Sequence, residues 1–364
     1  MSKLDELAEL GQSIWLDFIH RDLLTSGQLD DLVAQGLRGM TSNPSIFNQA
    51  ISQGDAYDDD IKGLVASGKS VQQIYESLAF ADIQAACDAL RQVYEKTEGL
   101  DGYVSLEVSP TLAHDTRGTI DQVRSYFQAV QRPNLMIKIP ATREGIPAIE
   151  AMLGEGINVN VTLMFSVSQL DDVSAAFISG LEHFKGRGGD VSRVASVASF
   201  FVSRVDSMID PMLDERGVNE LRGQLGLANA RLAYRRFTQI YQDERWQPLS
   251  QAGARVQRVL WGSTSTKDPA YPDTMYVDEL IGPHTVNTVP PETLEAFLDH
   301  GTVARTVDRD VDGAQAAVDK LAEVGIDLGD ITDELLAEGV QKFASAFDNL
   351  LQSLEARRAA LQPS

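Results

Sequence analysis

The chain alternates short apolar runs, rich in β-branched residues, with longer amphipathic segments, and this alternation limits the possible folds more than any other feature. Such a pattern is typical of an α/β protein with parallel strands. Eight strand–helix units fit a closed (β/α)8 barrel, or TIM barrel, so we predict a single barrel domain over residues 1–364. The expected strands are Ile14–Ile19, Gly39–Ser42, Tyr103–Val108, Leu135–Ile139, Asn158–Leu163, Val194–Val202, Val256–Gly262 and Val286–Val289.

Between these runs, apolar residues that recur every three or four positions predict helices. The main structural alternative is an open, doubly wound sheet. The glycine-rich phosphate loops that such sheets carry after a strand, GxGxxG and GxxxxGK[ST], are absent from the sequence. The closed barrel is therefore favoured, with helices expected at Leu29–Gln35, Val71–Lys96, Thr119–Gln131, Gly145–Gly154, Ser168–Phe184 and Leu221–Asp243.

Two regions exceed a minimal barrel. About 60 residues separate the second and third expected strands, which leaves room for extra helices. The segment 310–364 reads as helices, and we expect it to be a C-terminal helical extension that packs on the barrel wall. The segment 268–283 contains three prolines and is a candidate lid over the site.

Composition excludes several classes of partner and site. The 31 basic against 53 acidic residues give a net charge of -22, which disfavours nucleic acid and anionic membranes as partners and requires any phosphate site to be locally basic. The sequence has neither a secretory signal nor a membrane-spanning stretch, so we expect a cytoplasmic protein. Cys87 is the single cysteine and the five histidines lack metal-ligand spacing, so we expect no metal or other cofactor. The oligomeric state is left open.

Charged residues interrupt the apolar runs near the carboxyl ends of three expected strands. Asp17 lies in IWLDFI, Glu107 in YVSLEVSP and Lys138 in LMIKIPAT. Burial of a charge is costly unless it is paired, and each residue alone is explained equally well by a structural ion pair. Active sites of TIM barrels, however, are built at the carboxyl ends of the strands. The recurrence at one end of successive strands predicts a common site.

Further polar residues occur at the same end of other expected strands. These are Thr41 and Asn43 in GMTSNPSIF, Asn160 and Thr162 in INVNVTLMFS, and Ser199 and Arg204 in ASVASFFVSRVD. Lys267, in WGSTSTKDPAY, is the cation nearest the end of the seventh strand. It is either a phosphate ligand or a solvated loop lysine.

The chemistry that these residues favour is carbon–carbon bond cleavage through an imine. A lysine among apolar neighbours is biased towards the neutral amine, because desolvation penalises the ammonium. A neutral Lys138 can attack a carbonyl and form an iminium, which acts as an electron sink. Asp17 and Glu107 can accept and donate the protons that the cycle requires. No metal is needed for this chemistry.

The motifs GMTSNPSIF, MIKIPAT and GINVNVTLMFS, in this order, resemble those of the transaldolase family, in particular its longer actinobacterial-type branch. The resemblance extends from IWLDFIHRDLL to the C-terminal helices. It implies transfer of a dihydroxyacetone unit from sedoheptulose 7-phosphate to glyceraldehyde 3-phosphate. The products are erythrose 4-phosphate and fructose 6-phosphate, in the non-oxidative pentose phosphate pathway.

The resemblance also implies roles for individual residues. Lys138 matches the Schiff-base lysine, Asp17 the aspartate that handles the hydroxyl proton during bond cleavage, and Glu107 the glutamate that acts through a water molecule. The residues that match those around this water and the dihydroxyacetone hydroxyls are Thr41, Asn43, Asn160 and Thr162, and those that match the substrate and phosphate segment are Ser199 and Arg204.

The sequence departs from the family pattern in two segments of this phosphate region. The usual SPFVGR is replaced by SFFVSR, so Phe200 and Ser203 differ. Many relatives place an arginine after the seventh strand, where this chain has Lys267, which would act as a point charge rather than a bidentate fork.

Two functional alternatives remain open at this point. A class I aldolase would use Lys138 in the same way but release free dihydroxyacetone instead of transferring it. A non-catalytic barrel that binds sugar phosphates would be expected to lack one of Asp17, Glu107 and Lys138, and all three are present.

Overall fold

In the computed structural model, which describes residues 2–52 and 54–361, eight parallel strands close into a barrel in sequence order. This architecture confirms the predicted α/β (β/α)8 fold. Residues 1, 53 and 362–364 of the expected domain lie outside the described residues. The strands are β1 (Gln12–Asp17), β2 (Gly39–Thr41), β3 (Tyr103–Glu107), β4 (Leu135–Pro140), β5 (Val159–Met164), β6 (Ser196–Phe201), β7 (Arg258–Gly262) and β8 (Thr285–Val289).

The barrel closes by pairing β1 with β8, from Gln12 opposite Thr285 to Leu16 opposite Val289. β1 begins at Gln12, two residues earlier than expected. The polar Gln12 was not expected in a buried strand, but hydrogen bonds satisfy its side chain there. Its side-chain amide donates to the Leu280 carbonyl at 2.7 Å and to Thr285 Oγ1 at 3.0 Å. Asp17 consequently becomes the last residue of β1, at the carboxyl end of the barrel.

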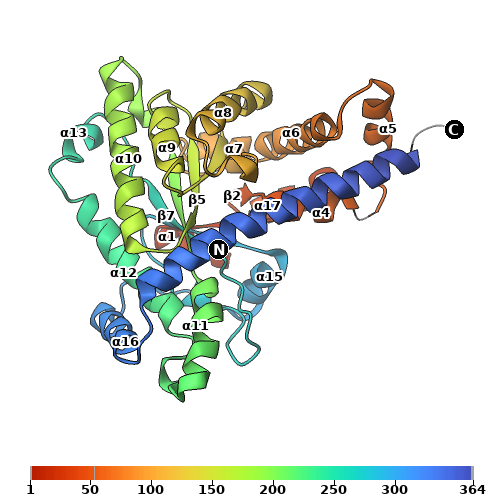
Figure 1. Cartoon of the computed structure of the whole chain (residues 1–364). Helices are drawn as coiled ribbons and strands as arrows, with labels where there is room; N and C mark the ends of the chain where they lie inside the picture. The colour runs from red at the N-terminus through yellow and green to blue at the C-terminus, as the bar shows by residue number, and fades with distance from the viewer. Residues whose placement is uncertain (1, 53, 362–364) are drawn as a thin grey trace.

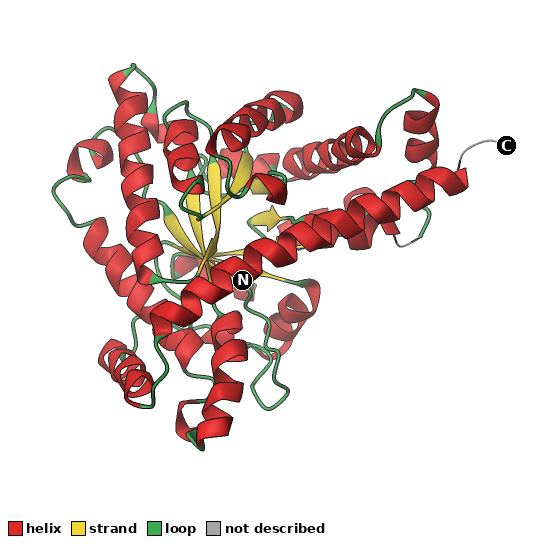
Figure 2. Cartoon of the chain, in the orientation of Figure 1, coloured by secondary structure: helices red, strands yellow, loops and turns green. Residues whose placement is uncertain are grey.

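Helices surround the strands on the outside of the barrel (Figure 2). Two expected helices differ from the structure: Val71–Lys96 is divided at Leu90, and Leu221–Asp243 becomes regular only from Leu225. The helices that follow β1 to β5, together with the N-terminal one, are α1 (Lys3–Glu9), α2 (Arg21–Thr25), α3 (Gln28–Ala34), α4 (Pro44–Ser52), α5 (Asp58–Ala66), α6 (Val71–Ala89), α7 (Arg91–Lys96), α8 (Thr116–Val130), α9 (Gly145–Leu153) and α10 (Val167–Gly186).

The remaining helices follow β6, β7 and β8. They are α11 (Ser203–Arg216), α12 (Leu225–Ile240), α13 (Gln247–Ser250), α14 (Met275–Asp278), α15 (Pro291–His300), α16 (Val311–Glu323) and α17 (Leu328–Leu361). Three short 3-10 turns, η1 (Pro110–Leu112), η2 (Val191–Arg193) and η3 (Asn219–Leu221), complete the connections. None of the described helices is both long and apolar enough to span a membrane.

The long helix α17 packs on the barrel, but across its carboxyl end rather than only along its wall. In Figure 1 it runs diagonally in front of the strands, from the side of α16 towards α4 and α5. It contacts β5, η1 and α11 over the barrel and then α4, α5 and α6 beyond it. A second hydrophobic cluster, separate from the main core, joins α16 and α17 to α11 and the ends of β5 and β6. The C-terminal extension is therefore positioned to contribute to a site at this end.

Candidate active site

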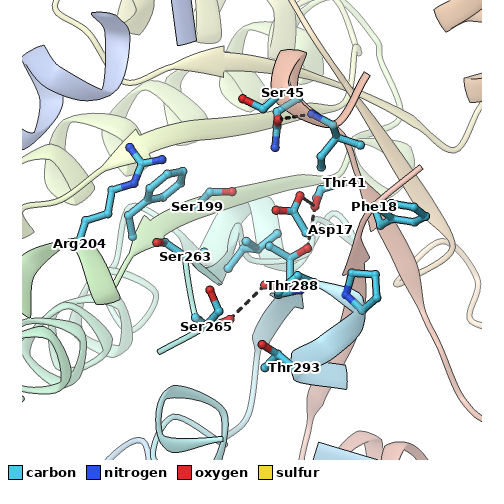
Figure 3. Close-up of a pocket in the computed structure, with 18 of the residues that line it drawn as sticks. Asp17, Phe18, Thr41, Ser45, Ser199, Arg204, Ser263, Ser265, Thr288 and Thr293 are labelled. Carbon is cyan, nitrogen blue, oxygen red and sulfur yellow. Dashed lines mark hydrogen bonds between the residues drawn. The ribbon is translucent and has the colours of Figure 1, made fainter. Parts of the chain in front are cut away.

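A cavity of about 700 Å³ lies at the carboxyl ends of the strands, and nine of the ten residues predicted from the sequence line it. Glu107 is the exception, and lines a separate cavity of about 10 Å³ instead. Figure 3 shows Asp17, Thr41, Ser199 and Arg204 around the main cavity. The nine residues are Asp17, Thr41, Asn43, Lys138, Asn160, Thr162, Ser199, Arg204 and Lys267.

Lys138 projects into the barrel from β4, while the adjacent Ile137 and Ile139 belong to the main hydrophobic core. Its side chain is 7% exposed. The Nζ atom donates a hydrogen bond to the Ser42 carbonyl at 3.1 Å and lies 3.4 Å from Glu107 Oε2. The amine is thus held in the cavity by two polar groups, the backbone carbonyl that follows β2 and the carboxylate of Glu107 on β3.

Glu107 lies opposite Lys138 in the register of β3 and β4 and is buried. Burial raises the pKa of its carboxyl to about 7, and the positive charge of Lys138 offsets only part of this effect. Oε2 forms no hydrogen bond with a described residue. A carboxyl with this pKa exchanges its proton close to neutral pH, as a general acid or base must.

Asp17 belongs to a hydrogen-bond network with two threonines, which lie on the strands on either side of β1. Thr41 Oγ1 lies 2.6 Å from Asp17 Oδ1, to which it donates, and 2.7 Å from Thr288 Oγ1 (Figure 3). The network joins β1, β2 and β8 and fixes the Asp17 carboxylate facing the cavity.

Amide and hydroxyl groups of β3, β5 and β6 form a second network. Asn160 Nδ2 donates to Ser105 Oγ at 3.0 Å, and Ser199 Oγ donates to Asn160 Oδ1 at 2.7 Å. Thr162 Oγ1 is buried and has no hydrogen-bond partner among the described residues. Asn43 is oriented by α4, since its Oδ1 accepts a hydrogen bond from the Ile46 amide at 3.0 Å.

Two cations other than Lys138 line the cavity, and their surroundings differ. Arg204, in the first turn of α11, has Cζ 4.9 Å from the ring centroid of Phe201. Burial lowers the pKa of the Arg204 guanidinium, although nearby carboxylates, with Glu107 foremost, act in the opposite direction. Lys267 is exposed, and its Nζ donates to Ser265 Oγ at 2.6 Å. Arg204 is therefore the enclosed cation and Lys267 the one at the rim.

Several residues of the cavity were not predicted from the sequence. Thr288 interrupts TVNTV near the end of the eighth strand, which is the same signal that identified Asp17, so it was accessible to the same reasoning. Phe201 and Phe343 line the cavity as aromatic residues in apolar contexts and carry no such signal. Phe343 comes from α17, far from the strands in sequence.

The candidate lid 268–283 is anchored beside the cavity. Tyr271 and Tyr276 each donate a hydrogen bond of 2.7 Å to a carboxylate of α11, at Asp210 and Asp206 respectively. Of this segment, Asp273 lines the cavity. Among the described residues, no group of three or more histidine, cysteine or carboxylate side chains is arranged to hold a metal ion.

The sequence of this chain is similar to those of known proteins over nearly its whole length. The sequence profile of the family described as Transaldolase/Fructose-6-phosphate aldolase matches residues 14–354. The chain is 49% identical to Transaldolase 2 of Nostoc punctiforme over 373 residues, which cover 98% of both chains. It is 49% identical to the transaldolase of Thermobifida fusca, over 99% of both chains. It is also 48% identical to the transaldolase of Mycobacterium bovis, over 97% of this chain and 96% of that protein.

Proposed function

The chain belongs to the transaldolase/fructose-6-phosphate aldolase family and acts as a transaldolase, and from this premise we propose how its residues perform the reaction. The enzyme transfers a dihydroxyacetone unit from sedoheptulose 7-phosphate to glyceraldehyde 3-phosphate, giving erythrose 4-phosphate and fructose 6-phosphate in the non-oxidative pentose phosphate pathway. The observation that carries the assignment of roles is the buried Lys138 amine, 3.4 Å from Glu107 and in the same cavity as Asp17.

Lys138 is the nucleophile of the proposal. Its Nζ attacks the ketone carbon of the donor sugar, and the carbinolamine loses water to leave an iminium. The bond between C3 and C4 then breaks, and its electrons move into the iminium to form an enamine on Lys138. The acceptor aldehyde takes the place of the aldehyde that has left, and the same steps in reverse release the new ketose.

Asp17 accepts the proton of the C4 hydroxyl as the carbon–carbon bond breaks. Its hydrogen bond from Thr41 supports this role, because it orients the carboxylate without neutralising it. In the second half of the cycle Asp17 returns the proton to the oxygen of the acceptor aldehyde.

Glu107 moves the protons of imine formation and hydrolysis through a water molecule. The position of its carboxyl beside Lys138, outside the main cavity, supports action on the imine rather than on the sugar chain. Glu107 Oε2 and Thr162 Oγ1 are buried and accept no hydrogen bond from the described residues, and groups of this kind are the ones that a buried water satisfies.

The remaining polar residues bind the substrate. Asn160 and Ser199, with Thr41 and Asn43, present amide and hydroxyl groups to the dihydroxyacetone hydroxyls. Arg204 and Lys267 supply the positive charge that a phosphate requires on a protein of net charge -22. We further propose that residues 1–364 act as one domain, with 310–364 as part of the site, and that the enzyme works in the cytoplasm, where its phosphorylated substrates are retained.

The test is borohydride reduction in the presence of fructose 6-phosphate, followed by peptide mass mapping. The proposal requires a stable three-carbon adduct on Lys138 and its absence in Lys138→Met, a variant of similar volume that cannot form an imine. Lys267→Met is the matched control and should retain the adduct. An adduct on another lysine, or transfer activity in Lys138→Met, would refute the role of Lys138. Release of free dihydroxyacetone in place of transfer would favour the aldolase alternative.

A further inference from the structure

Helix α17 places an aromatic side chain, Phe343, close to both Lys138 and the partly buried Arg204. The ring centroid of Phe343 lies 5.9 Å from Lys138 Nζ and 5.9 Å from Arg204 Cζ. The side chain lines both the main cavity and the small cavity of Glu107. Phe343 therefore forms a common wall of the two compartments.

The backbone of α17 lies close to the barrel one turn before this ring. A Cβ atom at Gly339 would lie 2.9 Å from Leu163 Cδ2 and 3.6 Å from Arg204 Nη1, so a glycine permits this approach. Leu163 itself has a φ of 60°, in the left-handed region that leucine rarely adopts, where the pairing of β5 with β6 shifts register. The glycine therefore allows α17 to contact both Leu163 and Arg204.

Arg204 depends on this contact more than Lys138 does. Lys138 is fixed by the Ser42 carbonyl and Glu107. The guanidinium of Arg204, in contrast, contacts the rings of Phe201 and Phe343, with Cζ 4.9 Å and 5.9 Å from their centroids, and its Nη1 is buried without a hydrogen-bond partner among the described residues. Attraction between a guanidinium and aromatic faces strengthens when water is excluded. The two rings thus orient Arg204 beside the cavity that its side chain lines.

We propose that Phe343 is a positioning residue that holds Arg204 for the phosphate of the substrate, so that α17 determines the preference for phosphorylated sugars. The proposal rests on the function proposed above. It predicts a specific defect, because a ligand without phosphate does not use Arg204.

The experiment compares Phe343→Leu with Phe347→Leu. Phe347 lies one turn later on the same helix and is buried against Tyr75 of α6, with ring centroids 5.4 Å apart. Both variants lose a buried ring from α17, but only the first removes a ring from Arg204. For each variant we would measure the KM for fructose 6-phosphate, the concentration of unphosphorylated dihydroxyacetone that gives half-maximal borohydride trapping on Lys138, and the midpoint of thermal unfolding.

In Phe343→Leu, the KM for fructose 6-phosphate should rise about tenfold, the change expected when a desolvated cation–π contact is lost. The trapping of dihydroxyacetone should be unchanged, and Phe343→Tyr, which retains a ring face, should restore the KM. Phe347→Leu should lower the unfolding midpoint without changing the KM. An unchanged KM in Phe343→Leu, or an equal loss for dihydroxyacetone, overturns the inference. Failure of the wild-type enzyme to form any adduct on Lys138 would instead reject the proposed function.

Discussion

Replacement of Glu107 by glutamine tests whether burial gives the carboxyl next to Lys138 a pKa suited to proton transfer at neutral pH. The ordinary pKa of such a carboxyl is 4.5, and burial raises that of Glu107 to about 7. Ionisation of the Glu107 carboxyl is thus less favourable by about 3 kcal/mol than ionisation of an ordinary glutamate in water. At pH 7 about half of the Glu107 side chains carry a proton, against about 0.3% for an ordinary glutamate.

The direction of the pH dependence follows from this shift. A raised pKa keeps the proton on Glu107 up to neutral pH, and the loss of the carbinolamine hydroxyl needs that proton. The rate of imine formation should therefore fall about tenfold per pH unit above about pH 7. Glu107→Gln should lack this descending limb and should be slower at neutral pH by about 10²- to 10⁴-fold, the usual contribution of a general acid.

The assay is a rapid-quench measurement of borohydride-trapped dihydroxyacetone on Lys138 over a range of pH. Asp17→Asn is the control, because dihydroxyacetone forms the imine without cleavage of a carbon–carbon bond. It should keep the limb, with its midpoint at slightly lower pH, since the charge of Asp17 contributes to the raised pKa of Glu107. A limb that persists in Glu107→Gln, or a wild-type midpoint near 4.5, would refute this account.

Two further predictions concern stability. Burial raises the pKa of Asp206 from 3.8 to about 6, so its contribution to stability is present at low pH and is lost as the pH rises through about 6. The free energy of unfolding of the wild type relative to Asp206→Asn, from urea titrations, should fall by about 2 kcal/mol between about pH 4 and pH 7, and a constant difference would contradict this. At the opposite end of the barrel, Arg258 and Asp101 form a buried ion pair at 2.8 Å. Asp101→Asn should cost about 3–5 kcal/mol by leaving the Arg258 charge unpaired, yet keep the adduct on Lys138, and loss of the adduct in folded protein would show that the two ends are coupled.

The barrel and most of the residues at its site could be predicted because strands impose a strict pattern. Side chains alternate between the two faces of a strand, so a charged residue in an apolar run must point either into the barrel or towards the helices that surround it. Asp17, Glu107 and Lys138 stood out for this reason, and parallel strands bring their carboxyl ends to one side. Their assembly around one amine followed from topology alone, although their chemical roles remain predictions.

The contribution of α17 could not be predicted by the same reasoning. Phe343 occupies an apolar position of an amphipathic helix, which is equally suitable for any hydrophobic contact. What brings it to the site is tertiary packing, in which the glycine at 339 allows α17 to approach Leu163 and Arg204. The division of the expected helix at Leu90 likewise has no glycine or proline to mark it.

The crossing of α17 over the open end of the barrel has a consequence for the order in which the enzyme becomes active during synthesis. When a ribosome has added the last residue of β8, Val289, all eight strands have been synthesised. More than fifty further residues must be added before Phe343, the ring beside Arg204, is part of the chain. A chain that ended at β8 would contain Lys138 but not this wall, so, on the role proposed for Phe343, selectivity for phosphorylated sugars requires the chain to extend into α17.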